Sequence, residues 1–353
     1  LAATDTLLKE ARDKGDQLQE FRALMYRARF QQTTGVDQKD VIAELEQRAS
    51  YASFPLKPLL QSVIAEQYWS YYQQNRWRIL DRTNVASADS EGIDTWDQHR
   101  FVGKVIALYR ASLEPEDSLK ATQVGTSAPL LIGDERTRAL RPALFDLLAH
   151  RALAVFTNSE TRLAEPAWRF RIEGASAFSV FEDFSGKPYQ HRDSTSWEFQ
   201  AMRLFQELER AHMSDTKPDA LVDVTLQRLI FVRERSTHAR KDSLYLEALE
   251  KLASRLSTDE CLGDVLLAQA HWHFGMSGKY QRLLDMDGRV ATWKNERRTA
   301  VSLCDDVIKR HAVSFAAHNA LSLRAQARQA ELTVQSESAV LPNVPFKASI
   351  SWR

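Results

Sequence analysis

The fold is indicated most clearly by the stretch KDSLYLEALEKLASRL, residues 241–256. Its apolar residues recur at helical intervals with charged residues between them: Tyr245, Ala248, Leu249, Leu252 and Leu256. This spacing places the apolar side chains along one face of an α-helix. The stretch therefore predicts an amphipathic helix that must pack against a neighbour.

Apolar stripes of the same kind cover most of the chain. One lies in residues 296–311, where Ala300, Cys304 and Val307 share a face. The others fall at about 16–32, 38–52, 56–73, 95–112, 141–156, 195–212, 218–235, 260–274 and 314–329. The connections between consecutive stripes are mostly short, which is typical of antiparallel helix neighbours. We therefore predict an all-α chain, an α-α superhelix of stacked antiparallel helix pairs.

Composition and start signals agree with this prediction. The 353 residues include 12 Gly and 10 Pro, fewer than turn-rich β folds use. Asp16, Thr95 and Ser196 are suitable N-cap residues, and Pro142 fits a first turn. A chain of this length also exceeds what a single core usually serves, so two lobes are expected.

The predicted division follows a change of pattern at residues 157–193. This segment breaks the helical periodicity with four phenylalanines set among Gly, Ser and charged residues: Phe170, Phe178, Phe181 and Phe184. We expect these rings to hold an irregular connecting segment against a helical surface. It would separate a helical lobe at 1–156 from a second lobe at 194–330.

The second lobe is predicted to resemble tetratricopeptide repeats. Between Tyr245 and Gln329 the helix pairs recur at roughly tetratricopeptide spacing, with Ala268 and Ala270 as small residues in one helix. The full repeat signature is absent. A tetratricopeptide-like arrangement is therefore expected toward the C-terminus, and not the strict repeat.

The last residues change from helical to alternating periodicity. Residues 331–336 and 346–352 alternate polar and apolar side chains around a turn at Leu341-Pro342-Asn343. This pattern predicts two β-strands. Two strands alone are not stable in water, so residues 331–353 are expected to be the opening strands of a truncated β-sandwich domain.

Several segments, in this order and spacing, resemble the N-terminal helical region of large bacterial alpha-2-macroglobulin-like proteins. They are YWSYYQQNRWRILDRT (68–83), Thr95-Trp96-Asp97, Tyr109 with Ser112-Leu113, ALRPALFDLLAHRAL (139–153) and the segment from Leu341 to Phe346. The resemblance spans nearly the whole chain. It implies that the helical region precedes a series of macroglobulin-type β domains.

The resemblance also implies a role. It predicts a protein of the periplasm or cell envelope that traps or inhibits proteases, with this region as a non-catalytic scaffold. Its partners would be other domains of the parent chain, proteases or envelope proteins. The family's thioester motif, Cys-x-Glu-Gln, is not matched by Cys261-Leu262-Gly263-Asp264.

Charge and motifs argue against several other classes. Lys plus Arg and Asp plus Glu are balanced at 47 each, so the chain has no overall attraction for nucleic acid. No uncharged apolar run reaches the roughly 18–20 residues that cross a bilayer, so no direct membrane insertion is expected. No Gly-rich nucleotide loop is present, and no cofactor is predicted.

Metal and catalytic sites are not predicted either. His271 and His273 are two residues apart, and such residues point to different sides of a helix. The adjacent carboxylates Glu182-Asp183 and Asp305-Asp306 likewise diverge on a helix. Cys261 and Cys304 are expected to be buried thiols rather than a disulfide. We therefore predict no enzyme activity.

Aromatic residues are the candidate interaction or packing residues. Trp69, Tyr72, Trp77 and Trp96 are the named candidates, and Trp and Tyr supply contact area at low entropic cost. Packing between two helix pairs is the favoured interpretation, with Arg76, Arg78, Asp81 and Arg82 forming an ion-pair network nearby. Two alternatives remain: a freestanding helical-repeat adaptor, and an α/α-toroid glycan-active enzyme.

Overall fold

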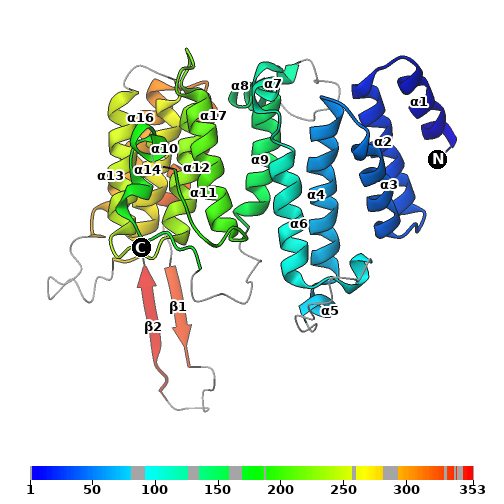
Figure 1. The fold of residues 1–353 in the computed structure, drawn as a ribbon. Helices are drawn as coiled ribbons and strands as arrows, with labels where there is room; N and C mark the ends of the chain where they lie inside the picture. Colours follow the sequence, from blue (N-terminus) through cyan, green and yellow to red (C-terminus); the bar gives the residue numbers. More distant parts are fainter. Residues whose placement is uncertain are drawn as a thin grey trace. The chain divides into compact units, whose positions relative to one another are not determined.

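Most of the described residues lie in helices, and a β-hairpin lies near the C-terminus (Figure 1). The computed structural model describes residues 2–80, 92–125, 135–158, 169–186, 188–256, 260–280, 293–329, 332–337, 339 and 345–352. Its contacts divide the chain into two compact units, Leu1–Lys241 and Asp242–Arg353. The predicted all-α class is therefore confirmed.

The first unit contains a helix for each predicted stripe up to residue 235. It also contains helices that were not predicted, at Ala2–Asp13, Arg76–Leu80, Glu116–Ala121, Glu135–Leu140 and Phe181–Gly186. In chain order the helices of this unit are α1 (Ala2–Asp13), α2 (Gln17–Thr33), α3 (Gln38–Ser50), α4 (Leu56–Gln74), α5 (Arg76–Leu80), α6 (Gln98–Ala111), α7 (Glu116–Ala121), α8 (Glu135–Leu140), α9 (Leu144–Phe156), α10 (Phe181–Gly186), α11 (Trp197–His212) and α12 (Asp219–Arg235). Two short 3-10 turns accompany them: η1 (Ile93–Thr95) and η3 (Ala175–Phe178).

The second unit begins within α13 and ends in the hairpin. Its elements are α13 (Lys241–Arg255), α14 (Leu262–Ser277), α16 (Glu296–Arg310), α17 (Phe315–Arg328), β1 (Leu332–Ser336) and β2 (Ala348–Trp352). On α13 the predicted stripe is the buried one, because Tyr245, Ala248, Leu249 and Leu252 are all shielded from solvent.

Capping side chains set several helix starts. The backbone N–H of Gln19 donates to the carboxylate of Asp16, and that of Phe199 donates to the hydroxyl of Ser196, as predicted. Thr95 was expected to begin the helix that spans about 95–112, and this is wrong. Asp97 caps α6 instead, accepting a hydrogen bond from the N–H of Arg100, and Thr95 belongs to η1.

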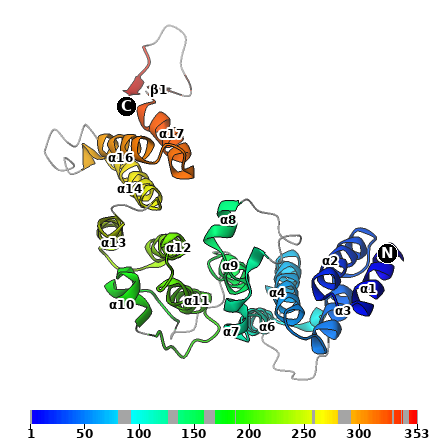
Figure 2. The same ribbon diagram turned by 90° about the horizontal axis from the view of Figure 1, so that it is seen from above.

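Helices of the first unit pack side by side with sequence neighbours. Helix α2 contacts α1, α3 and α4, while α4 contacts α6 and α9; α9 then contacts α11, which packs on α12. Figure 2 shows these helices end-on, in the order that the contacts give. Packed helix pairs are therefore observed, whereas the superhelical and tetratricopeptide-like descriptions stay predictions.

Three of the four phenylalanines of the irregular segment are buried and hold it against a helical surface, whereas Phe181 is only partly buried. Phe170, Phe178 and Phe184 are each no more than 5% exposed. The Phe170 ring contacts the ring of Phe199 on α11 edge-on, with 5.5 Å between centroids. The described part of the segment thus packs within the first compact unit. The predicted division into domains at 157–193 stays a prediction, because compact units are not the same as domains.

A fully buried arginine ties this segment to two helices. Arg228 of α12 donates from Nε to Glu209 of α11 at 2.7 Å, and its other nitrogens donate to the carbonyls of Ala177 at 2.6 Å and Ser179 at 2.9 Å. Its guanidinium also lies 4.0 Å from the ring centroid of Phe184. Burial raises the pKa of the Glu209 carboxyl, an effect that the charge of Arg228 opposes. One side chain therefore joins α11, α12, η3 and α10.

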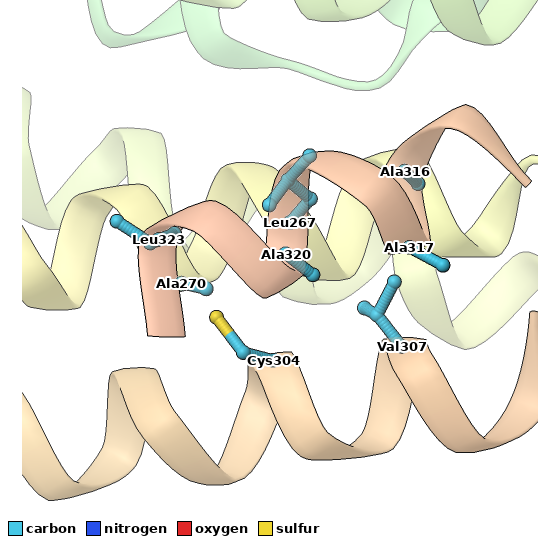
Figure 3. Close-up of a cluster of buried hydrophobic side chains, with 8 residues drawn as sticks. All are labelled: Leu267, Ala270, Cys304, Val307, Ala316, Ala317, Ala320 and Leu323. Carbon is cyan, nitrogen blue, oxygen red and sulfur yellow. The ribbon is translucent and has the colours of Figure 1, made fainter. Parts of the chain in front are cut away.

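In the second unit, α14, α16 and α17 pack around a core of small side chains (Figure 3). Cys304 and Val307 point from α16 toward α17, where the facing residues are alanines. Ala317 and Ala320 are almost fully buried. Small side chains at a contact let two helix axes approach closely. The packing of this core therefore depends on the buried positions of α17 remaining small.

Both cysteines are buried, and neither forms a disulfide. Burial raises the pKa of the Cys304 thiol to about 11. A protonated thiol is a weak nucleophile, so Cys304 acts as a small apolar residue of the α14–α16–α17 core.

The two predicted strands form an antiparallel hairpin. Strand β1 pairs with β2 in the register Val334↔Ile350 and Gln335↔Ser349. The side chains of Val334 and Ile350 are 60% and 58% exposed, and Phe346 is 55% exposed. The predicted turn at 341–343 lies outside the described residues. That the strands open a β-sandwich domain stays a prediction.

Replacing Arg228 should destabilise the first unit more than any surface change does. In Arg228→Met, Glu209 remains buried without its cation and two carbonyls lose their donor, so unfolding should require about 3–5 kcal/mol less. Urea unfolding measures this, with exposed Arg29→Met as the control expected to stay within about 0.5 kcal/mol. An unchanged urea midpoint in Arg228→Met would contradict the role of this residue.

Enlarging a buried alanine should disturb the core of the second unit. Ala320→Leu adds volume between α16 and α17, and overpacking of this kind costs about 1–3 kcal/mol. Ala325→Leu makes the same change on the exposed side of α17. Thermal unfolding followed by circular dichroism should show a lower midpoint for Ala320→Leu alone. Equal midpoints for the two variants would count against tight packing here.

Candidate functional site

Three of the four aromatic candidates lie in the interior. Trp69, Tyr72 and Trp96 are 7%, 1% and 8% exposed, whereas Trp77 on the short helix α5 is 81% exposed. A packing role is therefore supported for the first three and is wrong for Trp77. Both Trp77 and Ile79 belong to α5, and it is Ile79 that is buried, so Trp77 lies on the exposed side of this short helix.

The buried rings join α4, α9 and α11 to the segment that precedes α6. Trp69 of α4 contacts Trp197 of α11 at 4.7 Å between centroids, and Trp197 meets Phe156 of α9 at 6.1 Å. On the other side of α4, Tyr68 stacks on Trp96, with centroids 5.4 Å apart. Because these rings are in contact with one another, they are not available to a partner.

The predicted charge network near α5 is present in part. Arg78 donates to the hydroxyl of Tyr71 at 3.3 Å and approaches the carboxylate of Asp94 at 3.8 Å. Tyr71 donates to the same carboxylate at 2.6 Å. The network therefore links α4 and α5 to η1. Of the other predicted members, Arg76 has a buried Nε without a hydrogen-bond partner among the described residues, and Asp81 and Arg82 lie outside the described residues.

The candidate metal and acid–base residues are separated by the fold. His273 pairs with Glu296 of α16, and Asp305 accepts hydrogen bonds from Arg324 and Arg328 of α17. Among the described residues, no group of three or more potential ligands gathers in a way that could hold a metal ion. Helix α10 carries Glu182-Asp183 in its first turn.

One buried histidine is held between two carboxylates. His212 Nε2 lies 3.0 Å from Asp146 at the start of α9, and its Nδ1 lies 2.7 Å from Asp215. Burial disfavours its protonated form, but the hydrogen bonds and charges of Asp146 and Asp215 outweigh this and raise the pKa of His212. Asp146 also accepts the backbone N–H of Ala143. The histidine is 5% exposed, so the arrangement fastens α11 to α9.

An exposed aromatic surface lies instead on the first two helices, where the sequence did not single it out. A groove of about 450 Å³ runs between α1 and α2, lined by Leu7, Tyr26 and mostly polar neighbours. Leu7 is 52% exposed, and Tyr26 and Phe30 are each 46% exposed. The two rings stack with centroids 6.4 Å apart, and the Arg22 guanidinium lies 5.8 Å from the Tyr26 centroid.

A buried ion-pair cluster keeps the helices of this groove fixed. Glu20 of α2 accepts hydrogen bonds from Arg12 of α1 at 2.7 Å and from Arg48 of α3 at 2.6 Å. Burial would raise the pKa of Glu20, but the hydrogen bonds of Arg48 and Arg12 lower it below its usual value. We call the groove lined by Leu7 and Tyr26 the α1–α2 groove, and Phe30 lies beside it in contact with the Tyr26 ring.

The signal for this groove was present in the sequence but was ambiguous. Tyr26 and Phe30 are four residues apart and therefore share a helix face. The buried face of α2 carries Ala23, Leu24 and Ala28 instead. Periodicity identifies two apolar faces on this helix, and only the packed structure distinguishes the covered face from the exposed one.

Comparison with known proteins identifies no relative: no protein-family model, no curated protein and no solved structure matches the chain significantly. The resemblance to alpha-2-macroglobulin-like proteins therefore stays a prediction. Within the described ranges, no helix is both long and apolar enough to cross a membrane.

The stability of the first unit should depend on the protonation of His212. Its pKa is raised above the unfolded value of about 6.5, so its contribution is complete below that pH and is lost as pH rises through the folded pKa. In wild type the free energy of unfolding should therefore fall as pH rises above about 6.5. In His212→Gln this fall should be absent. Urea unfolding at several pH values measures it, with exposed His99→Gln expected to retain the wild-type profile. Identical profiles for His212→Gln and wild type would refute the assignment.

Proposed function

We propose that this chain is a non-catalytic helical scaffold that binds another protein through the α1–α2 groove. The observation that carries the proposal is the stacked, half-exposed pair of Tyr26 and Phe30 beside that groove. Tyrosine and arginine are enriched among residues that dominate protein–protein binding energy. The Arg22 guanidinium lies over the Tyr26 ring, so an arginine and a tyrosine are present together on this surface.

The buried ionisable side chains form contacts between helices, which supports a scaffold rather than an enzyme. Glu20, Glu209 and His212 are buried and engaged in contacts between helices. Catalytic acids and bases need access to substrate as well as a shifted pKa. These groups have shifted pKa values because they hold helices together.

We further propose that the scaffold belongs to an envelope-associated alpha-2-macroglobulin-like protein whose parent traps or inhibits proteases, with the chain in the periplasm or cell envelope. The hairpin is consistent with this. Val334 and Ile350 form an apolar cross-strand pair that is more than half exposed. An apolar pair of this kind suits a hairpin that packs against further β structure. A freestanding helical-repeat adaptor is the alternative.

Site-specific photo-crosslinking tests the proposed binding surface. Benzoylphenylalanine placed at Tyr26 should, in native cells, form a defined adduct with a second protein or with a β domain of the same polypeptide. The matched control is Lys57, an exposed residue on α4. Mass spectrometry of the adducts identifies the partner. Absence of an adduct at Tyr26, or identical adducts at both positions, would argue against the groove.

Affinity for the identified partner gives the quantitative prediction. Tyr26→Ala should weaken binding at least about tenfold, because a central aromatic hot spot contributes about 2 kcal/mol or more. Surface plasmon resonance with Lys57→Ala as control measures this. A macroglobulin-type β domain among the adducts would favour the parent family, and an unrelated protein would favour the adaptor alternative.

A further inference from the structure

A second cavity, of about 530 Å³, lies among α9, α11 and α12 and shares no lining residue with the α1–α2 groove. Its wall is largely hydrocarbon, from six apolar residues: Leu147, Leu153, Ala154, Phe205, Ile230 and Phe231. Small-molecule sites in proteins have volumes of about 300–1,000 Å³ and are lined in this way. The cavity is therefore large enough to hold a small organic molecule.

Two nitrogen atoms of lining residues lack hydrogen-bond partners among the described residues. They are Nε of Arg141 and Nε2 of His150. His150 is only 7% exposed, so its ring is shielded from bulk water. Buried polar atoms in proteins are nearly always paired. Two unpaired nitrogens beside one cavity indicate that an acceptor group would be bound there.

The protonation state of His150 fits the role of a neutral donor. Burial and the nearby charge of Arg141 lower the pKa of His150 to about 4, although Asp146 acts in the opposite direction. The charge of His212 also disfavours protonation, whereas a hydrogen bond with the side chain of Gln227, another lining residue, favours it. At neutral pH the imidazole is therefore uncharged, and one of its two tautomers donates from Nε2.

Two arginines line the cavity, and Arg141 is the one better placed to bind an anionic ligand. Arg151 already donates to Ser62 at 2.9 Å and to Glu66 at 2.6 Å. Glu234, which also lines the cavity, is on the solvent side of α12. The inner part of the cavity thus combines a positive charge with hydrocarbon.

We propose that this cavity binds a free amphiphilic monocarboxylic acid, with the carboxylate at Arg141 and His150 and the hydrocarbon chain against the wall formed by Phe205, Ile230 and Phe231. A carboxylate accepts hydrogen bonds from both nitrogens and compensates the charge of Arg141. The site is separate from the proposed protein-binding groove, so either assignment can fail without the other.

Two competing ligands fit the lining less well. A peptide would bring several backbone amides into a cavity whose wall is mainly apolar, and unpaired amides are costly to bury. A phosphate group has more oxygens and charge than Arg141 and His150 can satisfy. A single carboxylate with an apolar chain leaves neither partner unsatisfied.

Isothermal titration calorimetry with decanoate tests the proposal on the whole chain. Decanoate should bind at one site, while decanol and decylamine, which have the same chain length without the negative charge, should bind at least tenfold more weakly. Arg141→Gln should weaken decanoate binding at least tenfold. Ala154→Phe should abolish it by filling the cavity, and because Ala154 is exposed this variant leaves the core intact.

Nuclear magnetic resonance of the His150 ring gives a second measurement that does not depend on affinity. A bound carboxylate favours the imidazolium, so saturating decanoate should raise the pKa of His150 above about 4. The proposal is overturned if decanoate does not bind, if decanol binds equally well, or if Ala154→Phe retains binding. Displacement of decanoate by a peptide with a free C-terminus at lower concentration would also overturn it.

Discussion

The buried guanidinium of Arg228 is the constraint on which the first unit depends most. It donates to one oxygen of the Glu209 carboxylate and to two carbonyls with no access to water, while the other oxygen of that carboxylate has no hydrogen-bond partner among the described residues. Removing two opposite charges from water is costly, and only near-complete hydrogen bonding compensates for it. The positions of Glu209, η3 and the Phe184 ring are therefore set together. An irregular segment without regular backbone pairing is held in one place by this side chain and by the phenylalanines around it.

The second unit depends on close packing of small side chains among α14, α16 and α17. Alanines on α17 face Cys304 and Val307 on α16, so small side chains make much of this contact, and Leu323 of α17 and Leu267 of α14 complete the core (Figure 3). Gly263 extends the same principle to the start of α14. A Cβ atom there would lie 3.2 Å from the His311 ring and 3.3 Å from the Cβ of Ala316. A side chain at position 263 would therefore require the His311 ring or Ala316 to shift by a few tenths of an ångström.

Several aromatic and charged side chains of the first unit form contacts between helices in the interior. The rings of Trp69, Trp96 and Trp197 contact other rings, and Glu20 and His212 join helices. What remains for other molecules is limited to a few surfaces. The α1–α2 groove has exposed rings on a rigid base, which suits a protein partner. The cavity beside α9 has unpaired nitrogens in an apolar wall, which suits a small acid.

Periodicity and capping are local properties of the chain, so the sequence alone predicted the long helices from α2 onward, the two C-terminal strands and the buried stripe of α13. It did not predict α1 or the short helices α5, α7, α8 and α10. Asp16 and Ser196 were recognisable as caps from their neighbours alone. The sequence did not determine that Asp97 rather than Thr95 starts α6, or that Trp77 is exposed while Trp69 is buried. Both depend on the path of the chain between helices. Only the tertiary structure decided that Tyr26 faces solvent, and that Arg141 and His150 share a cavity with Phe205. Exposure and shared cavities depend on which elements pack together over long sequence separations, and helical spacing carries no information about them.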